Sequence, residues 1–227
     1  MSALALTLVL AAALAPAAAA RTSPLGRSVE GRPIVARELG DRHGPRVLVV
    51  GCIHGNECAG LAVVRELERR PPGRIDLWLV PNLNPDGYAA GTRTNADGVD
   101  LNHNFPAMWK RVGSRGYPGY SGPRPLSEPE TRIARALLLR LRPAVTIWFH
   151  QPQTIVRAWG HSIPAARRFA RLAGARFRAL PWPNGSATNW QNHRFPQAAS
   201  FVVELPSGPL TTAAARRYAA AVARAAR

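Results

Sequence analysis

The sequence of 227 residues has little negative charge and almost no lysine. Its 13 acidic residues stand against 30 basic ones, and Lys110 is the only lysine, so arginine carries nearly all of the net charge of +17. No run of basic residues alternates with aromatic residues, which argues against a specific nucleic-acid-binding protein. We therefore interpret the arginines mainly as a coding bias towards arginine and alanine. An anionic cell wall is the alternative partner for this charge.

The first twenty residues contain no charged side chain. An apolar stretch over residues 3–14 is followed by Pro16 and by small residues that end at Ala20. This pattern predicts a signal peptide over residues 1–20, cleaved before Arg21, and hence a secreted or cell-envelope protein. An uncleaved anchor is the alternative, but the stretch is short and alanine-rich for a bilayer span, so no stable membrane span is expected.

Cysteine is scarce, with only Cys52 and Cys58 in the chain. Their spacing is a poor match to the spacings of zinc-binding cysteines. In an exported protein the two residues can form a disulfide. The alternative is a pair of buried thiols at the end of a strand and the start of a helix, and the sequence leaves both interpretations open.

Internal repeats and long linkers are absent, so residues 21–227 are predicted to form a single domain. Apolar patterns predict strands at 32–40, 46–53, 74–83, 144–149 and 200–206. Helical spacing and caps predict helices at 57–70, 127–141 and 162–174 and at the C-terminus. Strands that alternate with helices predict an α/β fold in three layers, with a mixed, mostly parallel central sheet and helices on both faces.

Capping and turn signals refine these boundaries. Ser127 with Glu130 forms a capping-box pattern, and Ser162 is expected to cap the following helix. The motif "NPDG" at 84–87 is a turn signature. Two stretches without a clear period, 88–125 and 181–196, are predicted to be loops. Long loops in a compact domain usually carry function.

Two histidines and one carboxylate stand where the ends of strands are expected. His54 and Glu57 follow the apolar run "RVLVV" with only two residues between them, and His150 follows "AVTIWF". Ligands of α/β folds bind beyond the carboxyl ends of the strands. A catalytic zinc site needs three protein ligands and one open position, which these residues could supply. The alternatives are an ordinary strand-to-helix turn and a hydrogen-bonded structural histidine.

Glu204 lies inside the apolar strand motif "FVVELP". A carboxylate in this position is costly unless a polar or cationic group receives it. The functional interpretation is a general base that takes a proton from a water molecule. The alternatives are a side chain that turns outwards and one that pairs with an arginine.

Five motifs together resemble the zinc carboxypeptidase family, in particular its small bacterial branch of murein peptide amidases. The motifs, in family order, are "HGNE", "PNLNPDGY", "GTRTNADGVDLNHNFP", "FHQP" and "VVELPSGP". The resemblance implies a zinc-carboxypeptidase-like catalytic domain with one Zn²⁺ ion on His54, Glu57 and His150. It also implies that Glu204 is the catalytic glutamate.

The resemblance further assigns residues to the substrate. It implies that Arg93 binds the substrate and polarises the scissile carbonyl, and that Asn102 with His103 holds a substrate carboxylate. The family commonly has arginine at the position of His103, and a histidine offers one hydrogen bond with a variable charge. No tyrosine lies in residues 181–199 to match the family's lid, so Trp190 or His193 is expected in its place.

These features predict a secreted zinc-dependent metallocarboxypeptidase or amidase. The expected substrate is a peptide or muropeptide, with the bond hydrolysed in a peptidoglycan stem peptide. Two other functions stay open at this point. One is a desuccinylase-like or aspartoacylase-like deacylase of small acyl-amino acids, and the other is a secreted binding protein of the same fold without turnover.

Overall fold

The structure is a computed structural model that describes residues 20–225 of the chain. The predicted signal peptide over residues 1–20 therefore lies, apart from Ala20, outside the described residues. Among residues 20–225, no helix combines the length and the apolar character needed to cross a bilayer.

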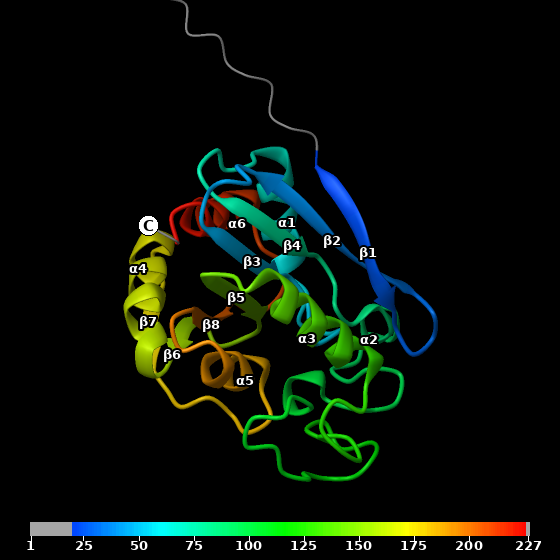
Figure 1. Cartoon of the computed structure of the whole chain (residues 1–227). Helices are drawn as coiled ribbons and strands as arrows, with labels where there is room; N and C mark the ends of the chain where they lie inside the picture. The colour runs from blue at the N-terminus through cyan, green and yellow to red at the C-terminus, as the bar shows by residue number, and fades with distance from the viewer. Residues whose placement is uncertain (1–19, 226–227) are drawn as a thin grey trace, which may run out of the picture.

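Within the described residues, eight strands form a single sheet (Figure 1). Their order across the sheet is β1-β2-β4-β3-β5-β8-β6-β7. The strands are β1 (Arg21–Arg27), β2 (Pro33–Gly40), β3 (Arg46–Val50), β4 (Asp76–Val80), β5 (Val145–His150), β6 (Ile155–Ala158), β7 (Arg176–Ala179) and β8 (Ala199–Glu204).

The central strands are parallel. β3 pairs in parallel with β4 and β5, β5 with β8, and β6 with β7, whereas β1–β2, β2–β4 and β6–β8 are antiparallel. The prediction of a mixed, mostly parallel sheet is confirmed. The sequence did not predict β1, β6 and β7, because these strands lack the long apolar runs of the central strands and β7 is largely exposed.

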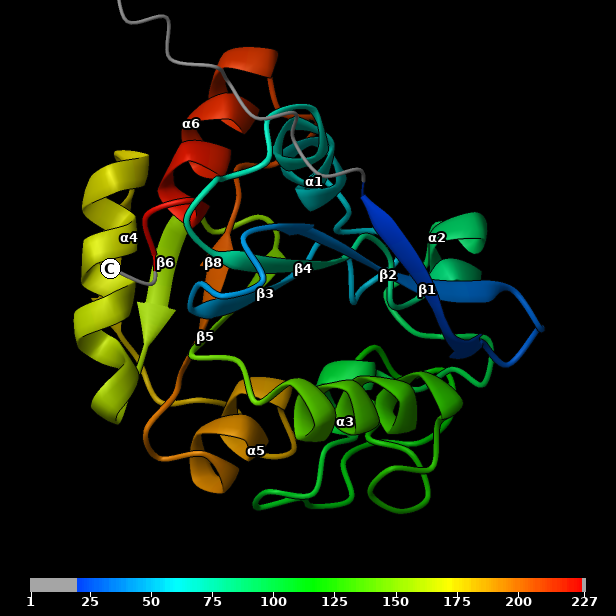
Figure 2. The same ribbon diagram turned by 45° about the horizontal axis from the view of Figure 1, so that its top comes forward.

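The helices cover both faces of the sheet, as predicted (Figure 2). On one face lie α1 (Gly60–Arg69), α4 (Ile163–Ala173) and α6 (Thr212–Val222), and on the other lie α3 (Pro129–Leu141) and α5 (Ala187–Arg194). The short α2 (Pro85–Ala90) and the 3₁₀ turns η1 (Leu101–His103) and η2 (Gly160–Ser162) complete the described elements.

Each face of the sheet packs into its own hydrophobic core. Successive side chains of a strand point to opposite faces, so Val49 lies in the core beneath α1, α4 and α6, and Leu48 lies in the core beneath α3 and α5. Because both faces are covered, the central strands can be apolar throughout. This explains the continuous apolar runs in the sequence.

Helix α5 corrects the prediction of a loop over residues 181–196. The Ser186 side chain accepts a hydrogen bond from the Asn189 amide and caps the helix. Gln191 donates from Nε2 to Thr146 Oγ1 of β5 at 2.7 Å, and Asn192 donates from Nδ2 to the Ser200 carbonyl of β8 at 2.9 Å. The polar side chains of α5 are therefore buried against polar groups of the sheet, which a search for apolar periodicity does not detect.

Several predicted boundaries were also wrong. Helix α1 begins at Gly60 rather than residue 57, so Glu57 lies in the turn before it. The "NPDG" motif starts helix α2. Helix α3 ends at Leu141 as predicted. The side-chain caps predicted at Ser127 for α3 and at Ser162 for α4 do not form. The Ser127 hydroxyl donates to the Glu128 carboxylate, and the Ser162 hydroxyl donates to the Asn192 side-chain carbonyl.

Candidate metal centre and active site

The turn that follows β3 carries two of the predicted metal ligands. A disulfide between Cys52 and Cys58 brackets this turn, so the alternative of two buried thiols is wrong in this structure. Gly55 lies directly on helix α2, where a Cβ atom would come within 1.9 Å of the Gly87 backbone. Only glycine allows this approach. The disulfide and the contact with α2 together hold the turn in place.

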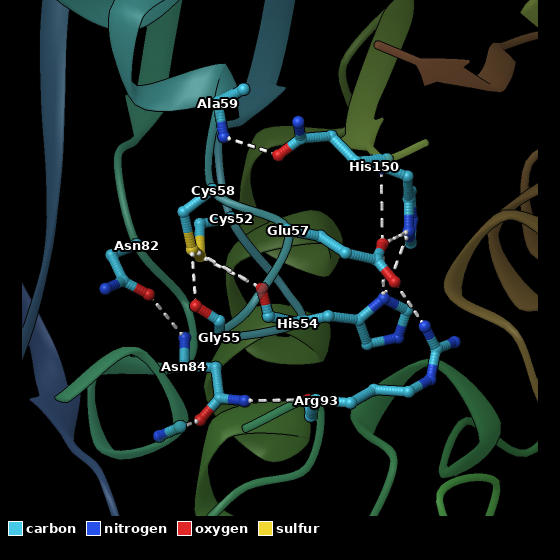
Figure 3. Close-up of a disulfide and its surroundings, with 12 residues drawn as sticks. Cys52, His54, Gly55, Glu57, Cys58, Ala59, Asn82, Asn84, Arg93 and His150 are labelled. Carbon is cyan, nitrogen blue, oxygen red and sulfur yellow. Dashed lines mark hydrogen bonds and ion pairs between the residues drawn. A yellow bond between two sulfur atoms is a disulfide. The ribbon is translucent and has the colours of Figure 1, made fainter. Parts of the chain in front are cut away.

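His54, Glu57 and His150 converge on one point (Figure 3). His54 Nδ1 lies 2.9 Å from Glu57 Oε2 and 3.2 Å from His150 Nδ1, and His150 Nδ1 lies 3.3 Å from Glu57 Oε2. The two histidines come from the ends of β3 and β5, which are neighbours in the sheet. The strand ends therefore meet as the sequence predicted.

These three atoms fit a zinc ion. A tetrahedral site with zinc–ligand distances of roughly 2.0–2.1 Å separates its ligand atoms by about 3.3 Å. The observed separations of 2.9, 3.2 and 3.3 Å match that spacing. Two histidines and one carboxylate are also a donor set of catalytic zinc sites, which leave the fourth position open.

The protonation of the ligands suits a cation. Burial lowers the pKa of His150 to about 4, so its imidazole is neutral near pH 7, and the tautomer decides which of its two ring nitrogens carries the lone pair. Burial alone would raise the pKa of Glu57, but the hydrogen bonds and the charges of His150 and His54 together outweigh burial and hold the pKa far below its usual value. Glu57 is therefore a carboxylate at any pH near neutrality.

Asp100 contacts a candidate metal ligand and was not singled out in the sequence analysis. Its carboxylate is fully buried, and Oδ1 lies 3.0 Å from His54 Nε2, the ring nitrogen that faces away from the metal centre. Burial lowers the pKa of His54, but the charge of Asp100 and the hydrogen bonds with Asp100 and Glu57 together outweigh burial and raise it. A carboxylate in this position fixes the orientation of a metal-binding histidine and makes it more basic.

Replacing Asp100 with asparagine is expected to lower zinc affinity about 10- to 100-fold, because the orienting carboxylate of His54 is lost. The measurement is a competition for zinc with a chelator of known affinity. Asp97→Asn is the matched control, because Asp97 lies on the same loop, is half-exposed and faces Arg115 instead of a metal ligand. Equal affinity in wild type and Asp100→Asn would contradict the role of Asp100.

Arg93 also joins the centre. Its Nη1 donates to Glu57 Oε1, and its Nε donates to Asp100 Oδ2 at 2.8 Å. The guanidinium is partly exposed, so it lies at the edge of the centre next to the metal ligands. From this position a positive charge can stabilise negative charge that develops on a substrate oxygen.

Asn102 and His103 lie in η1, next to Asp100. The Asn102 side-chain carbonyl accepts a hydrogen bond from the Ala187 amide at 3.1 Å. The NH₂ group of Asn102 is therefore the part of the side chain that can donate to a substrate. His103 is partly buried, and burial lowers its pKa, although the charge of Asp100 opposes this shift. The imidazole of His103 is therefore mostly neutral at pH 7.

Glu204 ends β8 and pairs with His150 on β5, so it lies beside the three-ligand group without belonging to it. The residue is 7% exposed, and among the described residues its Oε2 atom has no hydrogen-bond partner. Burial, followed by the charge of Glu57, raises the pKa of Glu204. A buried carboxylate with a raised pKa and a free oxygen suits proton transfer.

The structure does not support Trp190 as a lid residue. Trp190 is buried, and its ring packs against Phe105 and Phe195 in the core beneath α5. His193 is exposed on α5, and its Nδ1 lies 2.8 Å from the Asn189 carbonyl. The expectation of Trp190 over the site was therefore wrong. The segment around Trp190 is polar in sequence, so the sequence did not predict that its ring is buried in the core.

Comparison with known proteins identifies the family. A family model described as zinc carboxypeptidase matches residues 73–209, which is more than half of the chain. His54 and Glu57 lie before this range, and the fold brings them to His150 inside it. Murein peptide amidase A of Vibrio campbellii is 30% identical over 200 residues, covering 80% of this chain and 77% of the relative.

A second relative is murein peptide amidase A of Escherichia coli strain K12. It is 32% identical over 160 residues, which cover 62% of this chain. The matched part of the chain spans 63% of the length of that relative.

Solved structures agree with these matches. The murein-tripeptide amidase of Escherichia coli O157 superposes with a TM-score of 0.72 at 28% identity, covering 89% of this chain and 90% of that one. A carboxypeptidase A from Helicoverpa armigera gives a TM-score of 0.76 at 19% identity, covering 92% of this chain and 68% of that one, and shows the shared fold. The chain belongs to the zinc carboxypeptidase family, and His54, Glu57 and His150 are the candidate site for its zinc ion.

Proposed function

We propose that this protein is a zinc-dependent hydrolase that cleaves an amide bond in a peptide, and that its natural substrate is a peptidoglycan stem peptide. The observation that carries the proposal is the unpartnered carboxylate oxygen of Glu204 beside three converging ligand atoms. The relatives named murein peptide amidase support the choice of substrate.

The chemistry follows from the positions of the side chains. His54, Glu57 and His150 would hold the zinc ion, which would supply Lewis-acid chemistry by polarising a carbonyl oxygen and lowering the pKa of a water molecule. Glu204 accepts a proton from the attacking water and then donates it to the leaving nitrogen. Arg93 stabilises the negative charge on the carbonyl oxygen. Removing one such donor costs about 3–4 kcal/mol in a comparable enzyme.

The same geometry supports a proposal for how the end of the substrate is bound. Asn102 presents its NH₂ group and His103 a mostly neutral imidazole, so together they offer hydrogen bonds to a carboxylate but little charge at pH 7. An arginine at the position of His103 would offer a charged, two-pronged contact. The protein is therefore expected to cleave ordinary peptide C-termini poorly.

Product analysis tests the proposal. The zinc-loaded protein is incubated with muropeptides, with unmodified peptides that have free or amidated C-termini, and with N-succinyl and N-acetyl amino acids. Products are identified by mass, and a sample treated with a chelator is the control. Zinc-dependent release of an amino acid or peptide from muropeptides supports the proposal. Cleavage of acyl-amino acids alone, or of nothing, would contradict it.

Replacing His103 with arginine is expected to raise the ratio of kcat/KM for free over amidated C-termini about tenfold, because one stronger charged hydrogen bond is worth about 1.4 kcal/mol. In the wild type the same ratio should rise as the pH falls towards the lowered pKa of His103, since only the imidazolium is charged. His43→Arg is the matched control, because His43 is exposed in the turn between β2 and β3. An unchanged ratio in His103→Arg would show that His103 does not contact the carboxylate.

We also propose that the protein acts outside the cytoplasm, at the cell envelope. The uncharged leader over residues 1–20 motivates this location, and the net charge of +17 suits retention by an anionic wall. Fractionation of producing cells tests the location, and N-terminal sequencing tests cleavage before Arg21. An intact N-terminus in the cytoplasmic fraction would contradict export.

A further inference from the structure

The charge of the chain is unevenly divided along the sequence. Residues 131–227 contain 15 arginines and a single acidic residue, Glu204, so this part carries +14 of the net charge of +17. The other 12 acidic residues all precede it. A coding bias towards arginine and alanine explains why arginines are frequent. It does not explain why acidic residues are missing from this part of the chain, so the excess charge there needs another explanation.

Helices α4 and α6 bring several of these arginines together. The two helices lie side by side and run in opposite directions (Figure 2). Arg168 of α4 donates from Nη2 to the Ala225 carbonyl at 2.9 Å, and Arg217 of α6 donates from Nε to the Ala173 carbonyl at 2.8 Å. Each of these arginines is therefore fixed at the C-terminal end of the other helix, where a positive charge is favourable.

Two further arginines extend the positive surface. Arg171 lies in the last turn of α4, near the end that Arg217 contacts, and Arg224 precedes Ala225, which Arg168 contacts. Both are exposed. We call this set of side chains the α4–α6 arginine face, and it consists of Arg168, Arg171, Arg217 and Arg224.

The α4–α6 arginine face has no acidic partner among residues 20–225. The contrast is Arg216, which is next to Arg217 but pairs with Glu66 of α1 at 3.4 Å. In addition, Nε of Arg168 is buried without a hydrogen-bond partner among the described residues. A buried donor without a partner is costly, more so on a charged side chain. The face therefore keeps both charge and donors available for an anion.

The length of the face indicates an extended ligand. Arg217 and Arg224 are seven residues apart, which corresponds to about 10 Å along a helix. A single phosphate or carboxylate group cannot contact both ends. A chain with an anionic group in each repeat can contact all four arginines, and the two free oxygens of a phosphodiester match the planar donor pair of a guanidinium.

The surroundings of the face disfavour two other polyanions. Among the described residues, none of the exposed large hydrophobic side chains lies on α4 or α6, and Phe169 and Tyr218 of these helices are buried. A helix that binds a membrane surface inserts apolar side chains, and single-stranded nucleic acids stack their bases on aromatic rings. The face offers neither.

We propose that the α4–α6 arginine face binds an extended polymer of the cell envelope that carries a phosphodiester in each repeat. The polymer holds the protein at the wall through a surface separate from the metal centre, so the active site stays open to its substrate. This inference rests on the proposed location at the cell envelope and not on the proposed hydrolysis.

A binding experiment with a defined polymer tests the inference. Labelled poly(glycerol phosphate) is titrated with the zinc-loaded protein over a series of salt concentrations. In one variant, glutamine replaces all four arginines of the face. We expect the affinity of this variant to fall at least about tenfold, and the slope of log K against log salt to become shallower by about three, at roughly 0.7 for each lost phosphate contact.

Two further variants locate the binding surface. The matched control replaces four exposed arginines of α3 and its C-terminal end, on the other face of the sheet, and should change the slope by less than about one: Arg132, Arg135, Arg140 and Arg142. A double variant, Arg171→Gln with Arg224→Gln, changes only side chains that make no hydrogen bond among the described residues, so it leaves the packing intact. It should produce about half of the slope change of the full variant.

The outcomes separate the alternatives. An equal effect of the α3 variant would overturn the inference in favour of a diffuse positive field, and wild-type binding by the double variant would overturn it directly. Tighter wild-type binding to single-stranded DNA of equal phosphate number, or to vesicles with anionic lipids, would replace the wall polymer with that partner. Polymer binding without cleavage of muropeptides would count against the proposed function alone, and cleavage without polymer binding against this inference alone.

Discussion

Replacing Glu204 with glutamine is expected to leave zinc bound and to lower kcat at least about a hundredfold, the low end of the contribution of general acid–base catalysis. Glutamine keeps the size and shape of the side chain but cannot accept a proton at neutral pH. The loss should appear in kcat, because Glu204 is not among the three converging ligand atoms and its role is confined to proton transfer.

The measurement combines metal analysis with steady-state kinetics on the substrate identified by mass. Glu68→Gln is the matched control, because Glu68 is a carboxylate on α1 that pairs with Arg37 away from the site. This control should retain both zinc and activity. An active Glu204→Gln protein would show that Glu204 is structural, and loss of zinc from Glu204→Gln would show that it is a ligand.

Replacing His150 with alanine is expected to reduce bound zinc from about one ion per chain to a small fraction of that. Two protein ligands then remain where a catalytic zinc site requires three. The change also leaves Glu57 without one of the two histidines that hold its carboxylate. Zinc content after dialysis against a weak chelator is the measurement.

His161→Ala is the matched control for this variant. His161 is an exposed histidine that contacts the Ala198 carbonyl and no residue of the site, so its loss should leave zinc content unchanged. Circular dichroism of both variants shows whether the fold is retained. Near-stoichiometric zinc in a folded His150→Ala protein would contradict the assignment of His150 as a ligand.

The sequence predicted the metal centre well because its residues lie where strong local patterns end. His54 and His150 each follow a continuous apolar run, and parallel strands end at the same edge of a sheet. Glu204 could be singled out for a related reason, because a carboxylate in an apolar strand is costly to bury without a polar or cationic partner. The order of the strands in the sheet then places all three together.

The parts that the sequence did not predict depend on tertiary contacts. Asp100 lies in a loop without periodicity, and only the fold shows that its carboxylate is buried on His54. Helix α5 is polar in sequence and buried in structure, because its amides bond to Thr146 and Ser200 of the sheet. Strand β6 is only four residues long, too short for a reliable alternating pattern.

The arrangement of β3, β5 and β8 as consecutive neighbours has a consequence for folding. His54 and Glu57 are three residues apart, but His54 and His150 are separated by 96 residues. The third ligand therefore arrives only when non-local parallel strands have paired, a slow step in folding. A metal that binds all three ligands stabilises only chains in which this pairing is complete. The concentration of free zinc where the chain folds should thus set how many molecules reach and keep the native state.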